Sequence, residues 1–291
     1  MNDFYENYKK TDIIVTRKRR IKSHFPVFII ICWYFFKSMI NTLKSFLHPL
    51  FQLRGYCPCC CKKTTFIASN YWYRDSLRCM KCGSLPRDRQ VFKYLNEYMK
   101  GRTDFRVLEF APLPGAYMND RETSNYTISH YFPDEKFGKA GENFYNEDIQ
   151  KTTFPDASFD IIIHEDILEH INDPFQAVKE GIRILADGGV LVFTCPVKCL
   201  NKKTIRRTAI NKSGELEYLL PPQYHGNPIA NEGALVFWDF GKDFEALLRK
   251  EIPNNTKLEH IASADPHMGI CGEMLDMYCI TKIPAESGKK T

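Results

Sequence analysis

Two pairs of cysteines have the spacing of a metal site. Cys57 and Cys60 form the first pair, Cys79 and Cys82 form the second, and 18 residues lie between the pairs. This arrangement falls within the C-x2-C-x15–20-C-x2-C window of structural zinc sites, because two residues between ligands let a tight turn direct both thiolates to one ion. Gly83 permits the tight backbone around the second pair. Four protein ligands close the coordination shell, so we expect a zinc ion that holds structure and does not catalyse.

The register of the first cysteine pair is open. Cys59 and Cys61 flank Cys60, and Cys61 stands where such knuckles often carry glycine. Free cytosolic thiols are the main alternative to zinc, and redox or disulfide roles are a smaller one. The segment is also basic, which favours a solvated face over contact with phosphate or RNA; its basic residues are Lys62, Lys63, Arg74, Arg78, Lys81, Arg87 and Arg89.

Histidines and carboxylates later in the chain predict a catalytic site. His225, within residues 224–228, is the candidate general base, because imidazole titrates near neutral pH. A histidine that only orders this segment is the alternative. Asp166 is the second catalytic candidate, since its carboxylate would position an acceptor or a cofactor. We interpret Glu169 and His170 as a structural pair.

The elements that position these side chains alternate between short apolar runs and helical periods. Such alternation predicts βαβ units on a parallel sheet. A helix is expected after Asp173, which suits an N-cap. The expected strands span residues 105–110, 125–129, 158–164 and 190–195. Because ligands bind at the carboxyl ends of such strands, the loops after Glu109, His164 and Cys195 should carry the chemistry.

Two blocks of the chain resemble a known enzyme family. Residues 154–170 (FPDASFDIIIHEDILEH) and 184–193 (ILADGGVLVF) look like the class I S-adenosylmethionine-dependent methyltransferases. The resemblance covers about residues 105–283. It implies an α/β fold with a doubly wound, Rossmann-like sheet of seven strands, closed by an antiparallel hairpin that residues 259–261 and 274–280 would supply.

The resemblance also implies where the cofactor S-adenosylmethionine would bind. The family has an acid followed by glycines after the first strand, and this chain retains the acid and one glycine. His130 occupies the position where the family expects a ribose-binding acid. The implied cofactor-binding residues are Glu109, Ala111, Gly115, His130, Asp148, Ile149, His164 and Glu165, with Asp148 and Ile149 beside the adenine.

The knuckle, the Pro86-Arg87-x-Arg89 sequence and residues 224–228 resemble a narrower group. It consists of bacterial methyltransferases often encoded among surface-polysaccharide genes. This resemblance implies a hydroxyl or carboxyl of a small-molecule or lipid-linked saccharide as the methyl acceptor.

The head of the chain has the pattern of a membrane anchor. Five basic residues lie within residues 16–22, and the apolar run 25–36 follows. Within residues 24–53 the polar side chains share one helical face, which predicts an amphipathic helix at the inner face of the cytoplasmic membrane. A helix packed on the protein's own core and a tilted span are the alternatives.

Charge divides the chain. Residues 1–54 hold 10 Lys and Arg against 3 Asp and Glu, residues 55–104 hold 10 against 4, and residues 105–291 hold 20 against 28. The remainder after the first third is therefore acidic, which disfavours nucleic acid as a partner of the whole chain. The expected organisation is a basic N-terminus 1–23, the membrane helix 24–53, a zinc knuckle with linking helix 54–102, a methyltransferase domain 103–283 with a lid insertion 196–240, and a polar tail 284–291.

These features predict a membrane-associated methyltransferase of the cytoplasm with a structural zinc. One alternative is an RNA or protein methyltransferase that grips its substrate with the basic zinc knuckle. A second is a non-catalytic relative, because the glycine pattern and the ribose acid are incomplete. The oligomeric state is open.

Overall fold

The computed structural model describes residue 40 and residues 50–112, 125–226 and 233–284. Most of the range 24–53 and Gly115 therefore lie outside the described residues. No helix in the described part has the length and apolarity needed to cross a membrane. Strand β1 (Phe51–Cys57) begins within the range expected to be an amphipathic helix, so residues 51–53 are extended and pair with β2 (Lys62–Ala68).

The first described unit is a small module that contains the four spaced cysteines. Strands β1 and β2 form an antiparallel hairpin, and β3 (Arg78–Cys79) adds to its β2 edge. The short helix α3 (Tyr73–Ser76) precedes β3, and the helix α4 (Pro86–Met99) leads away from the module. Pro86 occupies the first turn of α4, as its missing N–H group favours.

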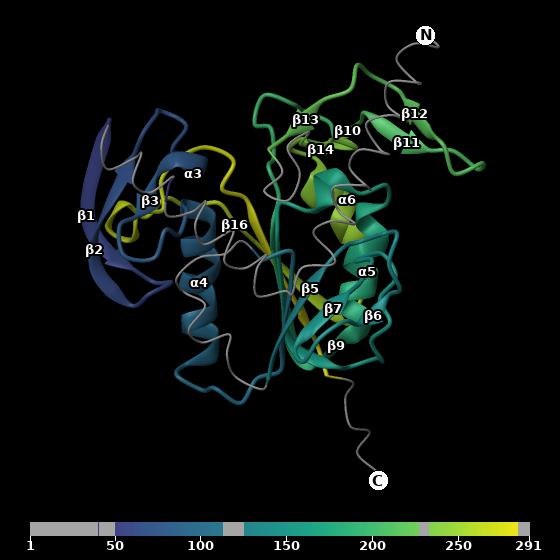
Figure 1. The fold of residues 1–291 in the computed structure, drawn as a ribbon, viewed down its shortest axis with the longest axis horizontal. Helices are drawn as coiled ribbons and strands as arrows, with labels where there is room; N and C mark the ends of the chain where they lie inside the picture. Colours follow the sequence, from purple (N-terminus) through teal and green to yellow (C-terminus); the bar gives the residue numbers. More distant parts are fainter. Residues whose placement is uncertain (1–39, 41–49, 113–124, 227–232, 285–291) are drawn as a thin grey trace.

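The second unit is an α/β domain with a sheet of eight strands in the described residues (Figure 1). The strands lie in the order β16-β17-β9-β8-β4-β5-β7-β6. Their bounds are β4 (Val107–Phe110), β5 (Tyr126–His130), β6 (Gly138–Lys139), β7 (Phe144–Asn146), β8 (Phe159–Glu165), β9 (Leu185–Thr194), β16 (Thr256–Ile261) and β17 (Met277–Lys282).

The five central strands run parallel, and the sheet closes with antiparallel strands at both edges. The β16–β17 hairpin confirms the expected antiparallel closure. The expected count of seven was wrong by one, because the two-residue strand β6 pairs with β7 at the far edge. Strand β9 begins at Leu185, five residues before the expected start at residue 190, and its pairing with β8 shifts between Phe159 and Ile161.

Helices cover both faces of this sheet. Val91 and Leu95 of α4 pack with Ile161 and Ile163 of β8 on one face. The helices α5 (Pro174–Ile184) and α6 (Phe244–Glu251) pack on the other face, where Ile162 points. Alternate residues of a strand face opposite sides, so the apolar centre of β8, Ile161 to Ile163, is buried from both sides. The result is the three-layer α/β architecture that the sequence predicts.

A long insertion separates β9 from α6. It contains the short strands β10 (Ile205–Arg206), β11 (Thr208–Ile210), β12 (Leu216–Tyr218), β13 (Tyr224–His225), β14 (Ala234–Leu235) and β15 (Trp238–Asp239). The one-turn helix η2 (Leu168–His170) follows β8, and η3 (Pro266–Met268) precedes β17. Figure 1 shows the insertion gathered beyond one end of the sheet.

Candidate active site

The end of β4 carries the first expected cofactor residues. Glu109 is buried and accepts a hydrogen bond from the Tyr126 hydroxyl on β5. Ala111 adopts a φ of 46°, in the left-handed region that favours glycine. Its amide donates to the Ser129 carbonyl at 2.7 Å. A small residue thus stands where the family pattern has glycine, and the backbone has the conformation that glycine would supply.

The expected ribose and adenine positions lie along β5 and after β7. The His130 ring packs against Phe132 and Phe144, with centroids 6.3 and 5.9 Å away. The Asp148 carboxylate accepts from the Gln150 amide at 2.8 Å and so closes a turn, while Ile149 is buried in the core.

His164 lies at the end of β8 on the α5 face. Its ring stacks on Phe193, with centroids 4.9 Å apart, and is almost fully buried. Burial lowers the pKa of His164 to about 3, so the ring is neutral at neutral pH. Neither ring nitrogen has a hydrogen-bond partner among the described residues.

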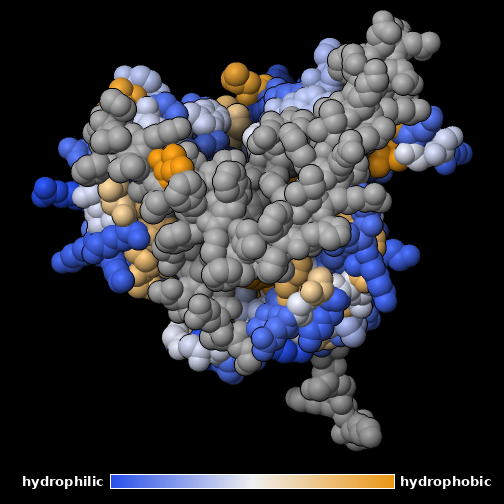
Figure 2. Space-filling view, in the orientation of Figure 1, coloured by the Kyte–Doolittle hydropathy of each residue, from blue (hydrophilic) through white to orange (hydrophobic). Residues whose placement is uncertain are grey.

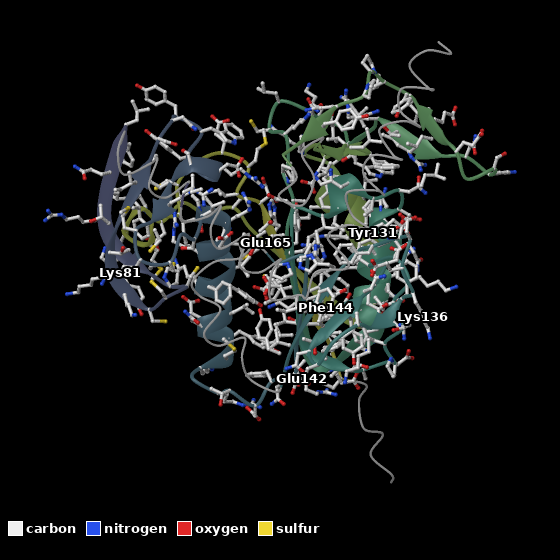
Figure 3. All side chains as sticks on the ribbon, viewed as in Figure 1. Lys81, Tyr131, Lys136, Glu142, Phe144 and Glu165 are labelled. Atoms are coloured by element: carbon white, nitrogen blue, oxygen red, sulfur yellow. The ribbon has the colours of Figure 1, made fainter. Side chains whose placement is uncertain are left out.

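The next residue, Glu165, points to the opposite face and meets the N-terminus of α4 (Figure 3). Its Oε2 lies 3.7 Å from Arg87 Nε. Burial raises the pKa of Glu165 well above its usual range, and the neighbouring Asp88 carboxylate raises it further. Glu165 Oε2, Asp88 Oδ1 and Ser129 Oγ are buried and lack a hydrogen-bond partner among the described residues.

These unpaired buried atoms fit the amino-acid end of S-adenosylmethionine. Buried polar atoms are normally hydrogen-bonded, so orphaned ones indicate a ligand. A cofactor ammonium beside Glu165 would favour its ionised form, so the Glu165 and Asp88 carboxylates would accept from that ammonium, and the Arg87 guanidinium would donate to the cofactor's carboxylate. When bound, the cofactor supplies an activated methyl group on a sulfonium.

Asp166 faces the cysteine module. Arg74 Nη2 donates to both of its carboxylate oxygens, at 2.6 and 2.7 Å, and Thr194 Oγ1 donates at 3.0 Å. Arg87 Nε lies 3.3 Å from Asp166 Oδ2. Burial acts to raise the pKa of Asp166, but the Arg74 and Arg87 guanidinium groups outweigh it and hold the pKa at about 2. The Asp166 carboxylate is therefore ionised. Through Arg74 and Thr194 it connects the cysteine module to the end of β9.

The four spaced cysteines come together in the module. The sulfur atoms of Cys57, Cys60, Cys79 and Cys82 all lie within 4.8 Å of one another. Cys57 Sγ and Cys82 Sγ are 3.6 Å apart, near the roughly 3.8 Å between sulfurs of a tetrahedral site with Zn–S distances of about 2.3 Å. The arrangement suits a closed, structural zinc site.

The two halves of the cysteine cluster have matching turns. Cys61 follows Cys60 with a φ of 51°, and Gly83 follows Cys82 with a φ of 74°. The Gly83 amide donates to the Cys79 carbonyl at 2.8 Å. Each cysteine pair is therefore followed by a residue with a left-handed backbone conformation. Glycine favours this conformation, and Cys61 occupies the corresponding position after the first pair.

A buried arginine ties the module to the C-terminal part of the chain. Arg89 is fully buried, and its guanidinium donates to the Leu77 carbonyl at 2.9 Å and to the Gly269 carbonyl at 2.6 Å. It also lies over the Phe66 ring, 4.5 Å from the centroid. One side chain thus holds module strand β2, the start of β3 and the loop before β17.

His225 is brought next to the pair that sequence reasoning treated as structural. One acceptor or donor atom each from Glu169, His170 and His225 lies within 4.8 Å of the others. The two imidazole rings meet edge to face with centroids 5.2 Å apart. Burial lowers the pKa of His170 to about 4 and also lowers the pKa of His225. Both rings are therefore neutral at neutral pH and can use a lone pair.

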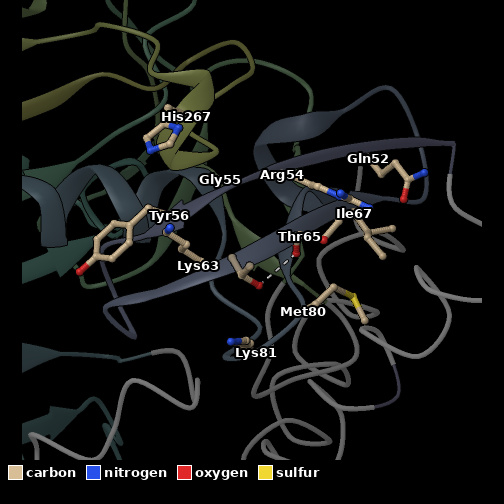
Figure 4. A pocket seen from close by; sticks show the side chains of 11 residues that line it. Gln52, Arg54, Gly55, Tyr56, Lys63, Thr65, Ile67, Met80, Lys81 and His267 are labelled. Carbon is tan, nitrogen blue, oxygen red and sulfur yellow. Dashed lines mark hydrogen bonds between the residues drawn. The ribbon is translucent and has the colours of Figure 1, made fainter.

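A hollow of about 890 Å³ lies on the module, away from the carboxyl ends of the sheet (Figure 4). Exposed basic residues line it, among them Arg54, Lys63 and Lys81. Figure 2 shows hydrophilic side chains along the outer margin of the module. Its lining residues lie on β1, β2, the turn after β3 and η3, and none of them is at the end of β4 or β8.

Comparison with known proteins identifies the sheet. Residues 122–193, from the approach to β5 through β9, match the family model described as a methyltransferase domain. The chain contains a methyltransferase domain. This match supports an S-adenosylmethionine-dependent methyltransferase, and the matched segment includes the carboxyl ends of β5 and β8.

Solved structures similar to this methyltransferase include an S-adenosylmethionine-dependent methyltransferase from Mesorhizobium loti, which is 14% identical, with 65% of this chain and 96% of that chain covered and a TM-score of 0.41. Another, from Methanosarcina mazei, is 13% identical over 66% and 98% of the two chains, with a TM-score of 0.34. An arsenic(III) S-adenosylmethionine methyltransferase from Chlamydomonas reinhardtii is 19% identical over 62% and 64%, with a TM-score of 0.32. No curated protein sequence matches with significance.

The candidate site at the end of β8 thus contains side chains that the sequence did not assign to it. Arg74 of α3 and Arg87 of α4 both reach Asp166 at the end of β8, and neither was assigned a role in the site from the sequence. Asp88 sits at the start of α4, where an acid is expected for capping and carries no functional signal. Glu169 and His170 were seen as a pair, and the structure adds His225 to them.

Proposed function

We propose that this methyltransferase transfers the methyl group of S-adenosylmethionine to a hydroxyl or carboxyl of a saccharide or lipid-linked saccharide. The observation that carries the acceptor side of the proposal is the approach of His225, from the insertion, to Glu169 and His170 at the end of β8. The insertion is long enough to form a lid. The resemblance to enzymes of surface-polysaccharide gene clusters supports the saccharide class.

Methyl transfer is an in-line displacement, so the protein's task is to align the acceptor oxygen with the sulfonium and to exclude water. A hydroxyl must also lose its proton. His225 is less buried than Glu169 and holds a neutral ring, which makes it the candidate to accept that proton. Asp166 acts as a positioning residue, because Arg74 already occupies both of its oxygens.

The test is transfer of label from methyl-labelled S-adenosylmethionine to a panel of saccharides, polyprenyl-linked saccharides and RNA. We expect label in a saccharide fraction. His225→Ala should abolish it while leaving cofactor binding intact, and His267→Ala, an exposed histidine on η3, should leave transfer unchanged. Label in RNA or protein alone would contradict the saccharide proposal.

A second candidate function is methyl transfer to RNA or protein. The basic hollow on the zinc-type module favours it, since Arg54, Lys63 and Lys81 could contact phosphates. RNA binding that weakens steeply with salt and is lost when these three residues are changed to glutamate would support this candidate. Salt-independent or absent binding would leave the saccharide proposal in place.

We further propose that residues 24–53 bring the enzyme to the inner face of the cytoplasmic membrane. The basic stretch before the apolar run supports attraction to anionic lipid. The full chain should co-sediment with vesicles that contain anionic lipid, and the bound fraction should fall at high salt. Equal recovery without vesicles would contradict this placement.

A further inference from the structure

We infer that Glu169, His170 and His225 form a binding site for a divalent first-row transition metal ion, distinct from the four-cysteine site. The three side chains come from two places in the chain. Glu169 and His170 lie on η2 directly after β8, and His225 lies on β13 in the insertion. One ligand atom from each lies within 4.8 Å of the other two.

His170 is oriented as a metal ligand. Its Nδ1 lies 2.9 Å from the Leu235 carbonyl oxygen, which can only accept a hydrogen bond. Nδ1 must therefore carry the proton, and Nε2 presents its lone pair toward Glu169, whose Oε1 is 3.7 Å away. A backbone carbonyl that holds the outer N–H of a ligating histidine is the usual support for such ligands.

Glu169 supplies the charge that a metal ion needs. The residue is 1% exposed, and its Oε2 has no hydrogen-bond partner among the described residues. Its carbonyl is fixed by the Phe237 amide at 2.8 Å, so the backbone cannot readily turn the carboxyl toward water. Buried polar atoms normally have a partner, and a cation between Glu169 and the two imidazoles would give Oε2 one.

The donor set indicates the class of ion. Two imidazole nitrogens and one carboxylate suit Mn²⁺, Fe²⁺, Co²⁺ or Zn²⁺ better than Mg²⁺ or Ca²⁺, which prefer all-oxygen sites. Three protein ligands leave open positions. In the proposed methyltransferase these positions would hold the acceptor oxygen, whose pKa the ion would lower, and His225 would then act as a metal ligand instead of as the general base. That role rests on the proposed function, whereas metal binding itself does not.

The site lies where an acceptor would have to enter. Strand β13, which carries His225, pairs with β14. The carbonyl of Leu235 in β14 orients His170. Two residues later, the Phe237 amide donates a hydrogen bond to the Glu169 carbonyl. The insertion is therefore joined to η2 by the same residues that would hold the ion. A bound metal would tie the lid to the end of β8.

The test uses the full chain with its cysteine site loaded with zinc. Mn²⁺ binding is followed by electron paramagnetic resonance, and additional Zn²⁺ is counted by elemental analysis after dialysis. We expect one further ion per chain for at least one of the two metals. His225→Ala and Glu169→Gln should each weaken its binding by at least about tenfold, and His267→Ala should not.

Each variant is checked for its cysteine-bound zinc and its melting temperature. His225 is partly exposed, so His225→Ala should fold even if Glu169→Gln does not. Failure to bind either metal beyond the cysteine site, or unchanged binding in folded His225→Ala, would overturn the inference. S-adenosylmethionine binding measured on the same samples separates the two proposals: cofactor binding without the metal refutes only the metal site, and the metal without cofactor refutes only the methyltransferase site.

Discussion

Arg74 on the cysteine module clasps Asp166 at the end of β8, with Nη2 2.6 and 2.7 Å from the two carboxylate oxygens. The same arginine donates from Nε to the Met274 carbonyl at 2.9 Å. One side chain thus connects the module to the sheet and to the segment before β17. The module is therefore part of the wall of the site, and its integrity should matter for cofactor binding.

Arg74→Ala should destabilise the fold by about 2 kcal/mol, because it leaves the partly buried Asp166 carboxylate without its main partner. Urea unfolding followed by circular dichroism measures the change. Arg102→Ala is the matched control, since Arg102 pairs with Asp104 on the surface and should contribute nothing measurable. Equal free energies of unfolding for the two variants would contradict a stabilising contact between Arg74 and Asp166.

The Asp166 pKa predicts a loss of stability in acid. Its folded-state pKa of about 2 lies below its ordinary value of 3.8. The stabilisation is therefore complete above pH 4 and is lost as the pH falls from about 4 through about 2, to a total of about 2 kcal/mol. Asp166→Asn should remove this part of the acid dependence. An unchanged profile between pH 4 and 2 in that variant would contradict the assignment.

Zinc should depend on Cys79 and not on Cys61. Cys79→Ser removes one of four ligands, so the zinc content measured by elemental analysis should fall by one ion per chain, with a large loss of stability. Cys61→Gly should retain the zinc and unfold no more easily, because Cys61 is exposed and its φ of 51° suits glycine. Zinc retained by Cys79→Ser would refute the ligand set.

Ala111 offers a test of the cofactor loop. Ala111→Gly should bind S-adenosylmethionine at least as well as the native chain, because glycine adopts the observed φ of 46° without strain. Ala111→Val should weaken binding by about tenfold or more, since a β-branched residue is strained there and would crowd the cofactor. Calorimetric titration compares the two, and equal affinities would place the cofactor away from this loop.

Local signals explain what could be predicted from the sequence. Asp173 caps α5 as expected, with its side chain 3.0 Å from the Gln176 amide, because a cap and a following proline are adjacent in the chain. The zinc-type cysteines also converge from short spacings. The sequence likewise placed β4, β5 and β8 within one or two residues of their observed bounds.

The features that could not be predicted from the sequence depend on long-range contacts or on very short elements. Arg74 and Asp166 are 92 residues apart, and no local sequence pattern around either residue indicates that they meet. The meeting of His225 with Glu169 depends on how an insertion of short strands folds back, which periodicity does not determine. Strand β6 is two residues long, and such a strand has no hydrophobic alternation to detect.

The most direct test is calorimetric titration of S-adenosylmethionine and S-adenosylhomocysteine into the zinc-loaded full chain. We expect both to bind with micromolar affinity, about −8 kcal/mol, and Glu165→Gln to weaken the binding of both. The absence of binding in a sample shown to be folded by its melting transition would contradict the assignment of this site to S-adenosylmethionine.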